Sequence, residues 1–182
     1  MEYEPNDITK IFLQDWTNRT KAIEKVFKSK NILKTYYQAA LQNKLQQWRK
    51  ITYGKLALIL IYDQAPRVIF DENDSKIYDT DKIAREITTE MFESSEYKKL
   101  SSLEIMFVFF PYHHSENPEH QKIANIIFKE LYEKNPKTFE WIYQSSNVYN
   151  KIISKFNRFL YRNKILGRES TEEEKEFLRQ SS

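Results

Sequence analysis

The longest apolar stretch of the chain is Leu-Ala-Leu-Ile-Leu-Ile-Tyr at residues 56–62. An apolar run of this length suits either a buried strand or a central helix, and its residues alone do not separate the two. A strand needs a second strand to pair with, and no other segment of the sequence is a candidate. We therefore predict a buried helix here and an all-α protein.

Amphipathic segments lie on both sides of this run. Apolar residues recur at helical spacing in residues 32–48, 83–92, 123–131 and 139–159. Short connections between such helices favour antiparallel neighbours. We therefore predict a single domain, residues 1–182, built of antiparallel helix hairpins and similar to tetratricopeptide-like folds, although no repeat of about 34 residues is visible.

Capping and helix-breaking residues predict where several helices begin and end. We expect N-terminal caps at Asp79 or Thr80, Ser101, Asn117 and Ser170, with the two serines forming capping boxes with Glu104 and Glu173. We expect helix ends near Gly54, Pro111 and Gly167.

The composition excludes several classes of protein. At an average usage of about 7%, a chain of this length would hold roughly 13 glycines, but it holds two. This scarcity argues against Gly-rich phosphate loops, dinucleotide-binding folds and β-sandwiches. The absence of Cys excludes disulfides, thiol catalysis and Cys-ligated zinc.

The N-terminal sequence has no signal-peptide pattern, and no apolar run approaches the roughly 20 residues that cross a bilayer. We expect a cytoplasmic protein that uses neither a membrane nor a cofactor. The net charge is +3, but the basic residues are concentrated, since residues 25–62 hold eight Lys or Arg and no acid, and residues 145–168 hold six and no acid. Such segments are either an anion-binding surface or ordinary solvated helix faces.

Polar residues interrupt the apolar pattern at three places. The first is Asp63, Gln64 and Arg67, directly after the apolar run. A carboxylate at a helix C-terminus is unfavourable unless a cation compensates it, and Arg67 is four residues away. This segment is either a structural ion pair or the charged wall of a ligand pocket.

The second interruption is the His-Ser-Glu sequence His114, Ser115 and Glu116. Adjacent residues cannot form a catalytic triad among themselves. A metal site from His113 or His114 with Glu116 and His120 matches no zinc-binding spacing, so we predict no metal. The alternatives are capping of the next helix and a role for the His114 imidazole as a general base.

The third interruption surrounds Arg158, Arg162 and Asn163. On a continuous helix, Lys151, Lys155, Arg158 and Arg162 would share one face, beside several aromatic residues. This arrangement suits an RNA-binding surface with stacking rings, but it equally suits a core stripe with solvated cations.

These three segments and residues 166–174 after them, taken in order, resemble domain-of-unknown-function family 924, whose members are mostly bacterial, uncharacterised and of tetratricopeptide-like helical fold. The matching stretches are residues 61–67, 111–116, 156–163 and 166–174, with Gln121 and Asp81 also at family positions. The resemblance covers about residues 31–180. Val68, Asn157, Leu160 and Tyr161 depart from the family pattern, which has Asn, Gly, Pro and His there. The family implies a fold and a candidate site but no reaction.

We expect the interrupting polar residues to converge on one Arg/His/Asp-lined cleft. Its expected members are Asp63, Gln64, Arg67, His114, Ser115, Glu116, Gln121, Arg158, Arg162 and Asn163. Bidentate arginines suit carboxylate and phosphate, so the expected function is binding of a small anionic ligand or an acidic peptide end. The alternatives are a hydrolase-like enzyme with His114 as base and Asp63 or Glu116 orienting it, and an RNA-binding module through residues 145–168. Whether the protein is an enzyme stays open.

Arg158 lies between Phe156 and Phe159 in an inward-facing stripe, so we expect its guanidinium to be buried. A buried guanidinium requires a carboxylate partner. Asp63 and Glu116 are the two acids without a local reason for their positions, and we name Asp63 as the partner.

Overall fold

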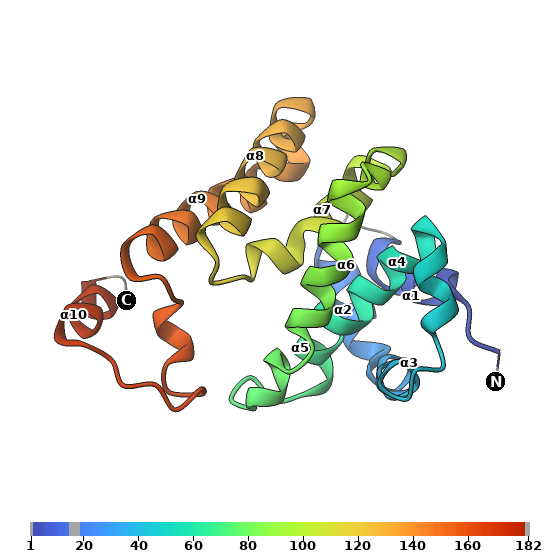
Figure 1. The fold of residues 1–182 in the computed structure, drawn as a ribbon, viewed down its shortest axis with the longest axis horizontal. Coiled ribbons are helices and arrows are strands. Elements are labelled where there is room, and N and C mark those ends of the chain that lie inside the picture. The colour runs from blue at the N-terminus through green and yellow to red at the C-terminus, as the bar shows by residue number, and fades with distance from the viewer. Residues whose placement is uncertain (1, 15–18, 181–182) are drawn as a thin grey trace. The chain divides into compact units, whose positions relative to one another are not determined.

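The computed structural model describes residues 2–14 and 19–180, and the regular structure of these residues is helical throughout (Figure 1), as predicted. The α-helices are α1 (Pro5–Leu13), α2 (Arg19–Lys28), α3 (Lys30–Leu41), α4 (Thr52–Ile59), α5 (Pro66–Ile69), α6 (Asp81–Glu93), α7 (Ser102–His113), α8 (Pro118–Lys134), α9 (Pro136–Phe156) and α10 (Glu172–Gln180). Short 3-10 helices are η1 (Gln46–Lys50), η3 (Ser75–Tyr78), η4 (Glu96–Lys99) and η5 (Leu160–Arg162), and η2 (Leu60–Gln64) is a turn of π-helix.

The chain forms two compact units. The first comprises the described residues of Met1–Glu72 together with Lys76–Pro111, and the second comprises Asn73–Ser75 and those of Tyr112–Ser182. Each unit is treated by itself below.

The apolar run that decided the fold class is the centre of the first unit. Residues 56–62 form the end of α4 and the start of η2, and all of them are buried. Helix α4 packs against α1, α6 and η1. The predicted helix is therefore confirmed, with one difference: its last turn is π-helical, because the Ala65 N–H donates to the Leu60 carbonyl, five residues back, at 2.9 Å.

Gly54 was expected to end the helix before it, but it lies inside α4, and α3 already ends at Leu41. A side chain at Gly54 would collide with the carbonyl of Trp48. The glycine therefore serves the close approach of η1 to α4 rather than the end of a helix.

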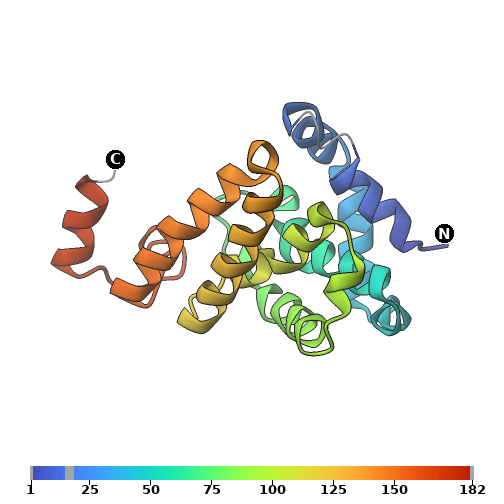
Figure 2. The same ribbon diagram turned by 90° about the horizontal axis from the view of Figure 1, so that it is seen from above.

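The second unit contains a long helix hairpin, in which α8 and α9 pack side by side (Figure 2). The Asn117 side chain accepts from the Glu119 N–H at 2.8 Å, and Asn135 accepts from the Thr138 N–H at 3.2 Å, so each helix begins at an Asn cap followed by Pro. The predicted cap at Asn117 is confirmed, and the tetratricopeptide-like arrangement of the whole chain stays a prediction.

The other two predicted helix ends, at Pro111 and Gly167, are also wrong. Helix α7 continues past Pro111 to His113, since a proline in the last turn removes few helical hydrogen bonds. Helix α9 ends at Phe156 rather than beyond Phe159, because Asn157 adopts a left-handed conformation with φ 55°.

Of the two predicted capping boxes, the Ser101–Glu104 box is present. The box of α10 lies one residue later than predicted. The Thr171 N–H donates to Glu174 Oε2 at 2.9 Å, and the Glu174 N–H donates to Thr171 Oγ1 at 3.2 Å.

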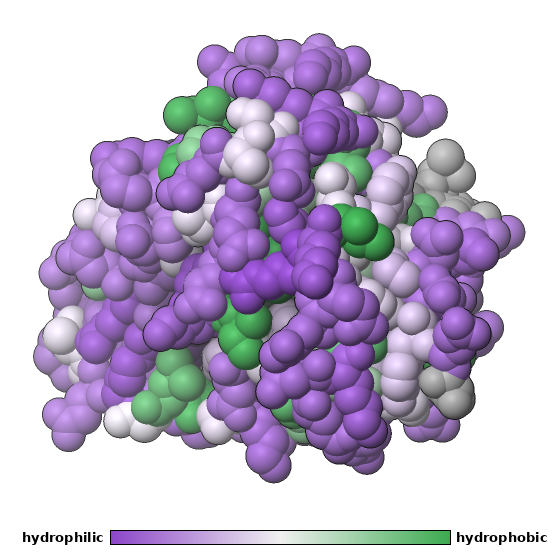
Figure 3. All heavy atoms as spheres, turned by 45° about the vertical axis from the view of Figure 1, so that its right-hand side comes forward, coloured by the Kyte–Doolittle hydropathy of each residue, from purple (hydrophilic) through white to green (hydrophobic). Residues whose placement is uncertain are grey.

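Hydrophilic residues cover most of the face shown in Figure 3, and the hydrophobic residues there form small separate patches. Among the described helices, none combines the length and apolar character that crossing a membrane requires.

The left-handed conformation of Asn157, at the end of α9, leads to a prediction about stability. Replacing Asn157 with Ala should lower the free energy of unfolding by about 1 kcal/mol, because a Cβ-bearing residue without a polar side chain is strained at positive φ. Asn157→Gly should leave the unfolding midpoint nearly unchanged, since glycine adopts this conformation freely. Chemical denaturation of both variants tests this, and equal stability of the Ala variant and the parent protein would contradict it.

Candidate functional site

In the first unit, Asp63 lies at the centre of a buried charge cluster. Arg67 approaches the Asp63 carboxylate at 3.5 Å and binds Asp81 through both terminal nitrogens at 3.1 Å. Asp63 is completely buried and Asp81 nearly so, whereas Arg67 is partly exposed. The predicted pairing of Asp63 with Arg67 is therefore present, with Asp81 as a second carboxylate.

Gln64 and Arg67 also line a small pocket of about 190 Å³, whose other walls are apolar. The ion pair of this segment is therefore present, and its role as the wall of a ligand pocket stays a prediction. Because Asp63 and Asp81 already compensate the Arg67 guanidinium, it is a poor receptor for an anion.

Pro66 leaves one main-chain carbonyl beside this charge cluster without its helical donor. Proline has no N–H, so the Tyr62 carbonyl, four residues earlier, receives no helical hydrogen bond from it. The Thr80 hydroxyl donates to that carbonyl at 2.6 Å instead, and Arg67 donates to the Asp63 carbonyl. The hydroxyl of Thr80, expected as a helix cap, is therefore bound to the main chain of η2.

In the second unit, the predicted residues after α7 complete the hydrogen bonds of the main chain. The Gln121 amide is fully buried, and its nitrogen lies 3.2, 2.7 and 2.7 Å from the carbonyl oxygens of Tyr112, His113 and Ser115. Ser115 Oγ accepts from the Asn117 N–H at 3.1 Å and lies 2.9 Å from His120 Nδ1. These residues fix the connection between α7 and α8.

Glu116 joins this connection to the segment after α9. One carboxylate oxygen accepts from the Phe159 N–H at 2.8 Å, and the two oxygens accept from Arg168 at 2.7 and 2.9 Å. Burial by itself raises the pKa of Glu116, but the hydrogen bonds from Arg168 and Phe159 together lower it below its ordinary value of 4.5. Glu116 is therefore an ionised structural group.

The predicted partner of Arg158 is wrong. Arg158 binds Glu174 through Nε at 2.6 Å and Nη2 at 2.8 Å, and it donates to the Glu169 carbonyl. The hydrogen bond from Arg158 lowers the pKa of Glu174. The Arg158 side chain is also 27% exposed rather than fully buried, and Asn163 donates to Glu174 Oε2 at 3.3 Å.

The guanidinium that is deeply buried belongs to Arg162. Its central carbon lies 4.5 Å from the Phe159 ring centroid, and only 6% of the residue is exposed. Arg162 lies in η5, after α9 has ended, so the predicted helical stripe of Lys151, Lys155, Arg158 and Arg162 does not exist.

Among the histidines, His113 is buried and His114 is only partly covered. The His113 ring stacks on Tyr149 with centroids 4.4 Å apart, and its Nε2 lies 3.2 Å from the Ser145 hydroxyl. In the part of the chain that the structure describes, no group of three His, Asp or Glu side chains could hold a metal ion.

The predicted residues therefore fall into two groups. Asp63, Gln64 and Arg67 lie together in the first unit, and the predicted residues from His114 to Asn163 lie in the second. Their convergence on one cleft stays a prediction.

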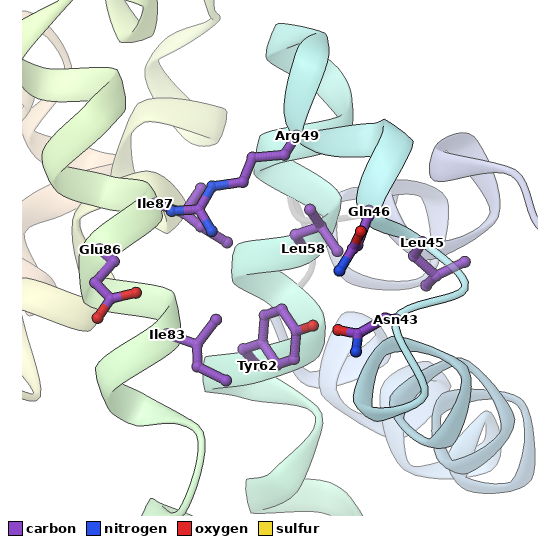
Figure 4. A pocket seen from close by; sticks show the side chains of 9 residues that line it. All are labelled: Asn43, Leu45, Gln46, Arg49, Leu58, Tyr62, Ile83, Glu86 and Ile87. Atoms are coloured by element: carbon purple, nitrogen blue, oxygen red, sulfur yellow. The ribbon is translucent and has the colours of Figure 1, made fainter.

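A larger pocket in the first unit was not predicted. It has a volume of about 440 Å³ and lies between the α3–η1 segment, α4 and α6 (Figure 4). Its walls are Asn43, Leu45, Gln46, Arg49, Leu58, Tyr62, Ile83, Glu86 and Ile87. The one sequence signal that could have indicated it is the basic character of residues 25–62, which include Arg49.

Some polar groups of this pocket have hydrogen-bond partners, and others have none among the described residues. Arg49 Nε donates to Glu90 at 3.0 and 3.1 Å, and its Nη2 donates to the same carboxylate. Its Nη1 has no hydrogen-bond partner among the described residues, and neither do the side chains of Asn43, Gln46 and Glu86. Tyr62 donates to the Ala40 carbonyl at 3.2 Å, and burial raises the pKa of this phenol, so it stays neutral.

Removing the Thr80 hydroxyl should destabilise the first unit. Thr80→Val leaves the buried Tyr62 carbonyl without its donor, at a cost of about 1–3 kcal/mol. Thr80→Ser keeps the hydroxyl and should retain most of the stability. Thermal unfolding separates the two variants, and a Val variant as stable as the parent protein would show that the hydrogen bond contributes nothing.

The lowered pKa of Glu116 predicts how the stability of the fold changes on acidification. A carboxylate with a lower pKa in the folded state stabilises the fold above its unfolded pKa, and this contribution is lost as the pH falls through the folded pKa. Glu116→Gln should therefore cost about 1.5–3 kcal/mol at neutral pH and lose less stability than the parent protein between about pH 5 and pH 3.

The exposed Glu140 on α9 provides the matched control, and Glu140→Gln should have neither effect. Urea denaturation across this pH range makes the measurement. If Glu116→Gln and the parent protein lose the same stability on acidification, Glu116 is not the titrating group.

Comparison with known proteins agrees with this fold. The chain is similar to a solved structure described as a protein of unknown function, ATU0120 from Agrobacterium tumefaciens, with 24% identity over 97% of each chain and a TM-score of 0.73. No curated protein matches. The family model described as "Bacterial protein of unknown function (DUF924)" matches residues 7–182, a longer region than the sequence motifs indicated. The chain thus belongs to the DUF924 family.

Proposed function

We propose that the protein is a binding module for a small ligand with a carboxylate group, and that the pocket beside Arg49 receives it. The expectation of a small anionic ligand is kept, but the receiving arginine differs from those predicted. The observation that carries the proposal is the Nη1 of Arg49, which binds no described residue, at the wall of a 440 Å³ pocket.

The hydrogen bonds of Arg49 support this role. Glu90 holds Nε and Nη2, which fixes the plane of the guanidinium and leaves Nη1 to donate. The hydrogen bond that Arg49 donates to Glu90 raises the pKa of Arg49, so the cation persists at every physiological pH. The side chain is 41% exposed, so a ligand can reach it.

The shape of the pocket supports a small molecule rather than a macromolecule. Its volume lies within the range of about 300–1,000 Å³ that is usual for ligand pockets. Leu58, Ile83 and Ile87 supply apolar surface, and the amides of Asn43 and Gln46 offer both donors and acceptors. A few polar groups on an apolar wall are typical of a site that orients one ligand.

The two alternatives receive less support. A hydrolase with Glu116 orienting His114 would need a free carboxylate, but both Glu116 oxygens accept from Arg168 and one also from Phe159. An RNA-binding stripe along one helix loses its basis, because α9 ends before Arg158 and Arg162.

The proposal predicts the effect of one substitution. With hexanoate as the probe, Arg49→Gln should weaken binding by about 10- to 100-fold, as the loss of a hydrogen bond to a charged group implies. Lys50→Gln removes the same charge one residue away, outside the pocket, and should leave the affinity nearly unchanged. Titration calorimetry measures both, with thermal unfolding to confirm that each variant is folded. Equal affinities of Arg49→Gln and the parent protein would refute the proposal.

A further inference from the structure

The two sides of the Arg49 pocket carry opposite charges. Asn43, Gln46 and Arg49 come from residues 25–62, which contain no acid. On the opposite side from Asn43 and Gln46, helix α6 contributes Ile83 and Glu86 (Figure 4). A ligand in this pocket therefore meets the Arg49 guanidinium on one side and the Glu86 carboxylate on the other.

One carboxylate on the α6 side of the pocket has no partner among the described residues. Residues 83, 86, 87 and 90 share one face of α6 at helical spacing. On that face Glu90 is neutralised by Arg49, whereas Glu86 makes no ion pair or hydrogen bond with any described residue. The charge of Glu86 also contributes to raising the pKa of Arg49, which agrees with its position near the guanidinium.

This charge balance argues against a ligand that is only an anion. Arg49 and Glu90 cancel, so Glu86 leaves the pocket with a net negative charge that repels a lone carboxylate. A ligand that carries a cationic group as well would turn this repulsion into an attraction. The apolar residues Leu58, Ile83 and Ile87 would contact its uncharged middle.

We infer that the ligand is zwitterionic, an amino-acid-like or short peptide-like molecule whose carboxylate meets Arg49 and whose ammonium meets Glu86. This inference rests on the proposed function, because it assumes that Arg49 receives the carboxylate. It adds a second recognition residue, Glu86, and a class of ligand.

Three probes of equal chain length test the inference: hexanoate, hexylamine and 6-aminohexanoate. In the parent protein, 6-aminohexanoate should bind more tightly than hexanoate by about two- to fivefold, as expected for an ion pair at an exposed carboxylate. In Glu86→Gln this preference should disappear, and hexanoate should bind at least as well as before. Hexylamine should bind more weakly than 6-aminohexanoate, because it lacks the group that meets Arg49.

Glu93→Gln is the matched control, because Glu93 is an exposed acid on the same helix that does not line the pocket. It should preserve the preference for 6-aminohexanoate. The readouts are calorimetric affinities and the NMR signal of the Arg49 side-chain N–H, recorded at low and high salt, since the preference should shrink with ionic strength.

The outcomes separate the two claims. If hexanoate and 6-aminohexanoate bind equally and Arg49→Gln weakens both, the zwitterion inference is wrong and the carboxylate site stands. If Glu93→Gln removes the preference as fully as Glu86→Gln, the effect is a general one of charge and the role of Glu86 is wrong. If neither hexanoate nor 6-aminohexanoate binds at millimolar concentration, the proposed function itself fails.

Discussion

The constraint on which this structure depends is that every interrupted helix must find donors for the carbonyls it exposes. A buried carbonyl without a partner costs about as much free energy as a lost hydrogen bond. Here buried side chains from other segments supply two of those donors: Thr80 for the break at Pro66 and Gln121 for the end of α7. The polar side chains of Thr80 and Gln121 are therefore buried for a structural reason.

The same constraint explains how far the sequence could be interpreted. Helical periodicity and local caps such as Asn117 depend on neighbours within a few residues, so the fold class and several helix starts could be predicted. The partner of Arg158 could not, because Glu174 lies sixteen residues away in a helix whose packing no periodicity indicates. A polar residue that pairs with the main chain also produces the same sequence pattern as one that binds a ligand. Glu116 and Gln121 were therefore grouped with a site although their hydrogen bonds are structural.

The Arg49 pocket could not be predicted from the sequence either, but for a different reason. Asn43, Gln46 and Glu86 are exposed polar residues in ordinary surface positions, and none interrupts an apolar pattern. The pocket arises only where η1 and α6 are brought together across α4. Its opposite charges come from two segments about forty residues apart, and only the basic one was visible as a charge imbalance in the sequence.

The π-helical turn η2 also sets the direction in which the residues after it point. A hydrogen bond that spans five residues encloses one residue more than an α-helical bond. Compared with a regular helix, that residue rotates everything after it by about 100°. Deleting one residue from 60–62 would restore the regular helix but keep Asp63 and Arg67 four residues apart on one face. Both would then turn together by about 100°, away from the Asp81 carboxylate that Arg67 binds.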